Sequence, residues 1–200
     1  MGGGTSKKKD DAQTEDTTKE QERLSTSLKS KISGYIKEGN WKDKYVRKQD
    51  LGSGMSGVVY LVSLRSDESQ TFACKSIGKN RLSTDEVLAL RDEISLCASL
   101  DHPNIVKIVE SYESETDITM IMECCRGGEL YDSLIDEGEY TQTRAAELFT
   151  MMVQAVNYCH QVGVVHRDLK LENFVFESRP AAESVRRVLH SVFFICFLAG

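Results

Sequence analysis

A glycine-rich segment between two β-forming runs constrains the fold of this chain more than any other feature. Residues 51–59 read LGSGMSGVV and fit the pattern GxGxxGxV, and β-branched, apolar character continues to residue 64. Because glycine has no side chain, its backbone N–H groups can lie close over phosphates. In a dinucleotide-binding oxidoreductase the same glycines would lead from a strand into a helix. The strand after Gly57 therefore predicts an antiparallel hairpin whose turn covers the phosphates of a nucleotide.

This hairpin belongs to a longer run of short strands with one helix. Strands are expected at 45–51, 58–64, 70–77, 105–109 and 118–122. A helix is expected between the third and fourth strands, because Ser83 and Glu86 have the spacing of a capping box. The apolar face of that helix recurs at helical spacing and consists of Val87, Leu90, Ile94, Cys97 and Leu100. These elements predict a first lobe over 45–125, with a five-stranded antiparallel sheet and one helix.

The periodic segments after Gly127 and Gly128 are helical. A short helix is expected around Leu130 and a long one over 143–161, where apolar residues recur along one side. The fold class is therefore α+β, with a second, incomplete helical lobe over 126–177.

A lysine and a glutamate stand where the two lobes would enclose a ligand. Lys75 lies on the third expected strand, after Phe72, Ala73 and Cys74, and Glu93 lies on the helix. For a single lysine, an exposed position on a strand is the ordinary interpretation. The order of glycine loop, strand lysine and helix glutamate instead favours a carboxylate that holds the ammonium on the α- and β-phosphates.

The segment 166–173 reads HRDLKLEN and combines three chemical groups within one short loop. Asp168 can accept a proton, Lys170 can reach a phosphate, and the amide of Asn173 can bind a metal ion. A lone histidine such as His166 is more often structural than catalytic, so it is not assigned as the base.

With these motifs, residues 45–176 resemble a eukaryotic serine/threonine protein kinase of the calcium/calmodulin-dependent and calcium-dependent group. The sequence DHPNIV at 101–106 and MECCRGGEL at 122–130 resemble the linker and hinge of that family. The resemblance implies a protein-kinase-like fold, ATP and Mg²⁺ as cofactors, and serine or threonine hydroxyls of proteins as acceptors. It also implies that Asp168 orients the acceptor hydroxyl, Lys170 neutralises the transferring phosphoryl, and Asn173 holds one Mg²⁺.

The resemblance assigns further residues to the nucleotide. Met122 would lie at the back of the adenine site, the backbone of Glu123 and Cys125 would bind the base, and Glu129 would touch the ribose. The apolar sandwich around adenine would be formed by Val59, Ala73, Leu130 and Val175. The full ATP-binding set expected is Leu51, Gly52, Ser53, Gly54, Met55, Ser56, Gly57, Val59, Ala73, Lys75, Glu93, Met122, Glu123, Cys125, Glu129 and Val175.

The sequence departs from the family after the catalytic loop. A second metal-binding aspartate would be expected near 184–188, where the chain reads SVRRV, and residues 174–200 contain no aspartate at all. Loss of one such electrostatic partner costs a rate factor on the order of 10²–10³. We therefore expect the kinase-like region to be truncated and the 200-residue chain to have little or no kinase activity. The alternative is a catalytically dead fragment that binds a nucleotide or a partner.

The two ends of the chain carry separate expectations. Residues 1–31 are too polar to offset their ordering entropy and are expected to be disordered. Gly2 and Ser6 fit the N-myristoylation pattern and lysines 7–9 follow, which allows weak membrane association; a solvated tail is the other interpretation. Residues 178–200 have no kinase counterpart and are either an accidental reading frame or the hydrophobic end of a short isoform.

Composition bears on partners and compartment. A formal charge of −6 argues against a nucleic-acid partner, which usually requires a basic face. Six cysteines without paired CxxC spacing or a secretory leader indicate reduced thiols and a cytoplasmic location. The natural substrate and the oligomeric state cannot be read from the sequence.

Overall fold

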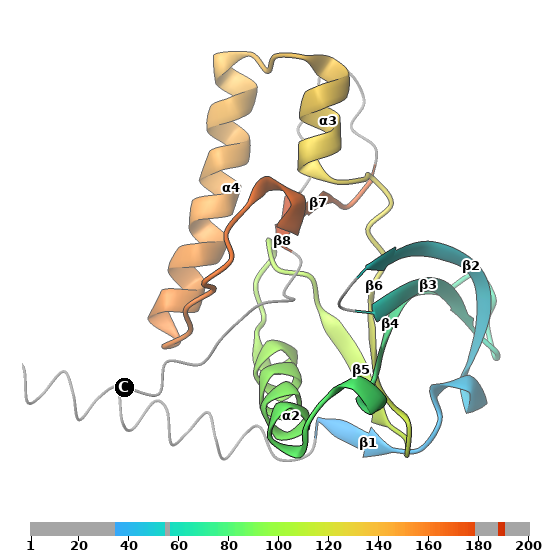
Figure 1. Cartoon of the computed structure of the whole chain (residues 1–200). Helices are drawn as coiled ribbons and strands as arrows, with labels where there is room; N and C mark the ends of the chain where they lie inside the picture. The colour runs from blue at the N-terminus through green and yellow to red at the C-terminus, as the bar shows by residue number, and fades with distance from the viewer. Residues whose placement is uncertain (1–34, 55–56, 179–187, 191–200) are drawn as a thin grey trace, which may run out of the picture.

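The first lobe is built on a six-stranded sheet, with helix α2 beside strands β1 and β5 (Figure 1). The strand order is β1-β5-β6-β4-β3-β2. The strands are β1 (Ile36–Glu38), β2 (Tyr45–Gly54), β3 (Gly57–Leu64), β4 (Thr71–Gly78), β5 (Ile108–Glu113) and β6 (Asp117–Glu123). Short 3₁₀ turns, η1 (Trp41–Asp43) and η2 (Lys79–Arg81), precede β2 and α2.

The computed structural model describes residues 35–54, 57–178 and 188–190, without the side chains of 53, 54, 57 and 188–190. The tail expected over 1–31, with Gly2, lies outside the described residues, as do Met55 and Ser56 of the glycine loop. Most of the expected non-kinase segment 178–200 lies outside them too. No helix in the described part of the chain is long and apolar enough to cross a bilayer.

The expectation of a five-stranded, wholly antiparallel sheet is wrong by one strand. Strand β1 pairs in parallel with β5, with Ile36 opposite Ser111 and Glu38 opposite Glu113. Only three residues form this strand, which is too short for an alternating pattern to be visible in the sequence. The other four pairings are antiparallel, including the expected hairpin, in which Gly54 pairs with Gly57.

The fourth expected strand is displaced along the chain. Strand β5 begins at Ile108, whereas the sequence predicted a strand over 105–109. Ile105 and Val106 are buried in the main hydrophobic cluster although they precede the strand. Their apolar character therefore reflects core packing, which sequence periodicity cannot distinguish from a buried strand.

Helix α2 (Thr84–Ser99) begins where the capping box predicted. The Ser83 side chain accepts from the Glu86 N–H, and the Glu86 carboxylate accepts from the Ser83 N–H at 2.7 Å. The buried side of the helix includes Ile94 and Cys97, which join sheet residues in the largest hydrophobic cluster. The cap and the apolar face together fix the helix that carries Glu93.

The second lobe consists of α3 (Leu130–Glu137), α4 (Gln142–Gln161), the 3₁₀ turn η3 (Leu171–Asn173) and two short strands. Strands β7 (Phe174–Phe176) and β8 (Val188–His190) pair antiparallel. The main cluster extends from the sheet to Ala155 and Cys159 of α4, so one continuous core joins the two lobes.

The two lobes are also joined by backbone pairing between the segment after β6 and strand β7. The N–H of Gly127 donates to the Phe176 carbonyl at 2.9 Å, and the N–H of Phe176 donates to the Gly128 carbonyl at 2.9 Å. A Cβ at position 127 would lie 2.3 Å from the Phe176 Cβ and 2.6 Å from the Ser178 carbonyl oxygen. Glycine is therefore required at 127 by the close approach of two backbones.

We predict that Gly127→Ala lowers the free energy of unfolding by about 1–3 kcal/mol, the usual cost of overpacking a tight site. Gly52→Ala is the matched control, because Gly52 has nothing within 4 Å of its Cβ position and no positive φ. Urea titrations of both variants would check this. An unchanged midpoint for Gly127→Ala would contradict the account of the lobe junction.

Candidate functional site

The glycine loop and Lys75 lie on neighbouring strands of the sheet. Gly52 pairs with Val59 across β2 and β3, and Val59 pairs in turn with Lys75 on β4. Directly opposed residues of an antiparallel pair project from the same face. The loop that the sequence predicted over the phosphates therefore lies one strand away from the predicted phosphate-binding lysine.

Lys75 is a buried cation, with only 5% of its surface exposed. Burial lowers the pKa of its ammonium group to about 8, and the charge of Glu93 opposes that shift. Desolvation of a charged group is costly, and a nearby opposite charge offsets part of the cost. The structure thus brings together the lysine and the glutamate that the sequence paired.

An ion cluster fixes the helix that carries Glu93. Arg91 of α2 donates two hydrogen bonds to the Glu113 carboxylate of β5, at 2.8 and 2.6 Å. Lys79 donates to the same carboxylate at 2.9 Å and to the Ser114 carbonyl at 2.6 Å. Since Arg91 lies two residues before Glu93, this cluster determines how close α2 stays to the sheet.

Most of the side chains expected around adenine gather in one apolar cluster. Ala73 and Met122 are buried and directly opposed on β4 and β6, and Val59, Cys125 and Val175 pack against the same cluster. Such a set of apolar side chains beside a few polar groups suits a flat heterocycle.

Two residues of the expected nucleotide set make contacts within the protein that the sequence did not indicate. Leu130 belongs to a different cluster, with Leu148, Phe174 and Phe176 of the second lobe. The Glu123 N–H donates to the Lys107 carbonyl at 3.0 Å, so a base contact there would have to use the Glu123 carbonyl oxygen.

The three residues assigned to catalysis lie together in the loop before η3. The Lys170 ammonium lies 2.8 Å from Oδ2 of Asp168. The Asn173 amide donates to the Asp168 carbonyl oxygen at 2.7 Å and to Oδ2 at 3.1 Å. Hydrogen bonds from Lys170 and Asn173 lower the pKa of Asp168, so this carboxyl is ionised at neutral pH.

His166 supports the loop from its buried side. Its Nδ1 accepts a hydrogen bond from the Asp168 N–H at 3.1 Å. Burial lowers the pKa of His166, which favours a neutral ring with its proton on Nε2. The geometry agrees with the interpretation of His166 as a positioning residue.

The backbone of the loop holds a feature that the sequence did not indicate. Arg167 has φ of +64°, the one non-glycine residue with positive φ in the part of the chain that the structure describes. Arginine has no preference for this conformation, which costs of order 1 kcal/mol. The left-handed backbone at Arg167 bends the chain between His166 and Asp168. This bend could not be predicted from the sequence and is seen only in the folded structure.

Acidic side chains border the site next to the lobe junction. Burial raises the pKa of Glu129, and the charges of Asp132 and Glu172 raise it further. Glu129 also forms an isolated antiparallel bridge with Val175 of β7. The expected ribose residue and the catalytic loop are therefore close enough for their charges to interact.

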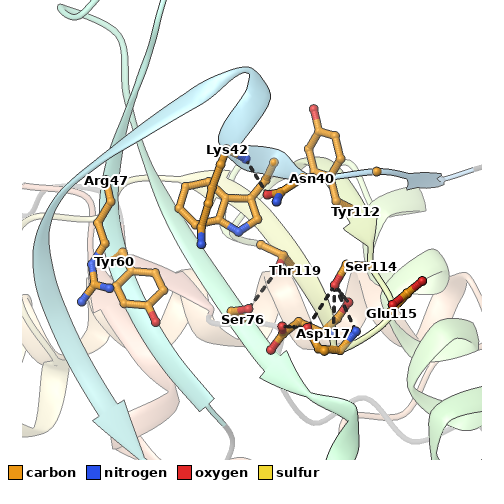
Figure 2. Close-up of a pocket in the computed structure, with 13 residues that line it drawn as sticks. Asn40, Lys42, Arg47, Tyr60, Ser76, Tyr112, Ser114, Glu115, Asp117 and Thr119 are labelled. Carbon is orange, nitrogen blue, oxygen red and sulfur yellow. Dashed lines mark hydrogen bonds between the residues drawn. The ribbon is translucent and has the colours of Figure 1, made fainter.

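A separate hollow of about 450 Å³ lies on the other face of the sheet. Figure 2 shows Tyr60, Ser76 and Thr119 facing it, with Oγ of Ser76 and Oγ1 of Thr119 3.0 Å apart. Ser76 follows Lys75 on β4, so the two side chains project to opposite faces. This hollow has neither the glycine loop nor the buried lysine, and we do not assign the nucleotide to it.

The segment where a second metal-binding aspartate was expected is only partly described. Residues 184–187 lie outside the described residues, and Val188 begins strand β8. Among the described residues, no group of three or more histidine, cysteine, aspartate or glutamate side chains could hold a metal ion. Asn173 is the residue that the sequence assigned to a metal ion.

The protein kinase domain family matches residues 45–186, which is more than half of the chain. The chain belongs to the protein kinase family. Calcium-dependent protein kinase 1 of Arabidopsis thaliana is 44% identical over 145 residues, covering 72% of this chain and 24% of that protein. Calcium-dependent protein kinase 10 of Oryza sativa subsp. japonica is 42% identical over 149 residues, covering 74% and 25%. Calcium/calmodulin-dependent protein kinase type 1 of Macrobrachium nipponense is 41% identical over 137 residues, covering 68% and 39%.

These likenesses confirm the predicted family and its calcium-dependent group of serine/threonine kinases. The chain spans about a quarter of the length of the two plant relatives. Membership of this family accounts for the order of the glycine loop, Lys75 and the catalytic loop along the chain.

We predict that Lys75→Met stabilises this kinase at pH 7 by about 1–3 kcal/mol, because methionine removes the cost of burying an ammonium group. In the folded protein the pKa of Lys75 is about 8, below its ordinary 10.5. The cost is therefore full below pH 8 and is lost as the pH rises toward 10.5. Urea titrations at pH 7 and pH 10 would show the gain shrinking at the higher pH, and a less stable variant at pH 7 would contradict the assignment.

Proposed function

We propose that the chain binds ATP between its lobes and, as part of a serine/threonine protein kinase, directs the γ-phosphoryl group to a protein hydroxyl. The observation that carries the proposal is the buried Lys75, placed beside the glycine-loop strand and influenced by the charge of Glu93. A buried cation at the edge of an apolar slot is suited to a polyphosphate attached to a flat base.

The catalytic loop supplies the groups for transfer. Asp168 is ionised, so its carboxylate can accept a hydrogen bond from the acceptor hydroxyl and orient that oxygen toward the γ-phosphorus. As the new O–P bond forms and the bond to ADP breaks, the hydroxyl proton passes to Asp168. The Lys170 ammonium, 2.8 Å from Asp168, would offset the negative charge on the phosphoryl oxygens.

The oxygen donors fit a Mg²⁺ ion that is bound mainly through phosphates. Because the Asn173 Nδ2 group donates to two oxygens of Asp168, its amide oxygen is the atom available to a metal ion. Mg²⁺ in such sites takes one or two protein oxygens and completes its shell with phosphates and water. When bound, the ion would neutralise charge on the phosphate oxygens.

We further propose that the 200-residue chain alone turns over slowly. Residues 174–200 contain no aspartate, so the second metal-binding aspartate that the family places after the catalytic loop has no counterpart there. The rate deficit would be on the order of 10²–10³ relative to an intact kinase. A binding-only role, in which the chain holds a nucleotide or a partner without catalysis, is the second candidate, favoured by the same sequence feature.

The acidic border of the site suggests a basic residue in the substrate. Glu129 interacts electrostatically with Glu172, and the two would present carboxylates beside the acceptor hydroxyl. Such a pair favours a lysine or arginine near the phosphorylated residue. By the resemblance to calcium-dependent kinases, arginine before the acceptor is the preferred form.

The nucleotide half of the proposal is tested by thermal shift with Mg²⁺-ATP. We expect ATP at 100 times its Kd to stabilise the wild-type chain by about 2.7 kcal/mol and to leave Lys75→Met unshifted. Lys48→Met is the control, since Lys48 is an exposed lysine of β2 that pairs with Glu68. Equal shifts in all three proteins would contradict nucleotide binding at Lys75.

The transfer half is tested with radiolabelled ATP and an arginine-containing peptide. We expect slow labelling that disappears in Asp168→Asn. Turnover as fast as that of an intact kinase would contradict the slow-turnover proposal, and labelling no greater than in Asp168→Asn would favour the binding-only role.

A further inference from the structure

An apolar groove of about 620 Å³ runs along α4 beside the catalytic loop. Phe149 and Val153 of α4 are 65% and 47% exposed there, and Leu169 is 53% exposed. The other apolar residues lining it are Met152, Val156, Leu171 and Phe174. Contiguous exposed apolar side chains of this size usually mark a surface that is covered by something else.

The groove favours an apolar and uncharged occupant. Its lining includes two basic side chains, His160 and Lys170, and no carboxylate. A strongly charged peptide or a polar ligand would find few partners in it, whereas aromatic and branched aliphatic side chains would replace water over its length.

Strand β8 brings the chain to the edge of this groove. His190, the last residue of β8, pairs with Phe174 of β7, and Phe174 lines the groove. The backbone of β8 also packs against α4. Strand β8 therefore ends next to the apolar surface.

The ten residues that follow have the composition that the groove favours. The segment 191–200 reads SVFFICFLAG, in which every residue from 192 to 199 is apolar and none carries a charged side chain. In extended form, eight residues span about 26 Å. The stretch of α4 from Phe149 to His160 is about 17 Å long, so the segment can cover it.

We propose that residues 192–198 dock in the α4 groove of their own chain. Exposure to water is unfavourable both for the apolar groove and for the apolar segment, and docking removes both surfaces from water at once. The proximity of β8 to α4 raises the effective concentration of the segment at the groove above that of any second molecule. This proposal does not depend on nucleotide binding or phosphoryl transfer.

Disulfide trapping between the groove and Cys196 tests the proposal in the full chain. Val153→Cys places a thiol in the groove, and oxidised glutathione accepts the two electrons released on bond formation. Val109→Cys is the matched control, because Val109 is 46% exposed but lies on β5 of the first lobe. Peptide mapping by mass spectrometry identifies which cysteines are joined.

We expect the Val153→Cys chain to form a bond with Cys196 at monomer mass, at least about tenfold more than the Val109→Cys chain does, as the higher effective concentration requires. Adding Phe193→Ser and Phe194→Ser should return the yield to the control level. Equal yields at positions 153 and 109 would overturn the proposal. A bond found only at dimer mass would overturn it in favour of a second copy as the occupant.

The binding of an apolar dye gives an independent readout that needs no introduced thiol. If the segment covers the groove, the Phe193→Ser/Phe194→Ser chain should enhance the fluorescence of anilinonaphthalene sulfonate more than wild type does. Circular dichroism would verify that both proteins keep their helices. Equal fluorescence from two folded proteins would contradict docking.

Discussion

The burial of one ammonium group in the sheet is the constraint on which the rest of the site depends. Lys75 lies on a strand between β3 and β6, almost out of contact with water, and desolvation moves its pKa down to about 8. A protein keeps such a costly group only where an anion or a function requires it. Glu93 supplies part of the compensating charge, and the phosphates of a nucleotide would supply the rest.

Several contacts far from the lysine maintain this arrangement. The Arg91–Glu113 pair holds α2 against β5, which keeps the helix that carries Glu93 near the sheet. Behind α2, the Asp101 N–H donates to the Tyr158 hydroxyl at 3.0 Å, and His102 stacks on the same ring. These contacts tie the first lobe to α4 and so to the catalytic loop that follows it. The position of Asp168 relative to Lys75 is therefore set by packing between elements distant in sequence.

Structural features that depend on residues close together in the sequence could be predicted from the sequence. The Ser83–Glu86 cap and the glycine hairpin were predicted correctly, because each depends on residues a few positions apart. Strand β1 was missed because three residues show no period and its partner β5 is distant in sequence. Ile36 lies opposite Ser111, 75 residues further along the chain. The start of β5 was predicted too early because Ile105 and Val106 are buried in the core without pairing as part of a strand.

The candidate site likewise has features that depend on neighbours in sequence and features that depend on tertiary contacts. The grouping of Asp168, Lys170 and Asn173 follows from their closeness in sequence. The structure places the Lys170 ammonium and the Asn173 amide within hydrogen-bonding distance of the Asp168 carboxylate. The left-handed backbone at Arg167 and the close approach at Gly127 depend on elements that meet only in the folded chain. No propensity marks an arginine for positive φ, so tertiary structure alone reveals that bend.

Direct titration of Lys75 by NMR tests the central claim most closely. With the lysine side chains labelled with nitrogen-15, the Nζ resonance of Lys75 should titrate with a pKa near 8 in the free chain. Saturating ATP should raise that pKa, because phosphate charge favours the protonated form. A pKa near the ordinary 10.5 that does not respond to ATP would contradict the account.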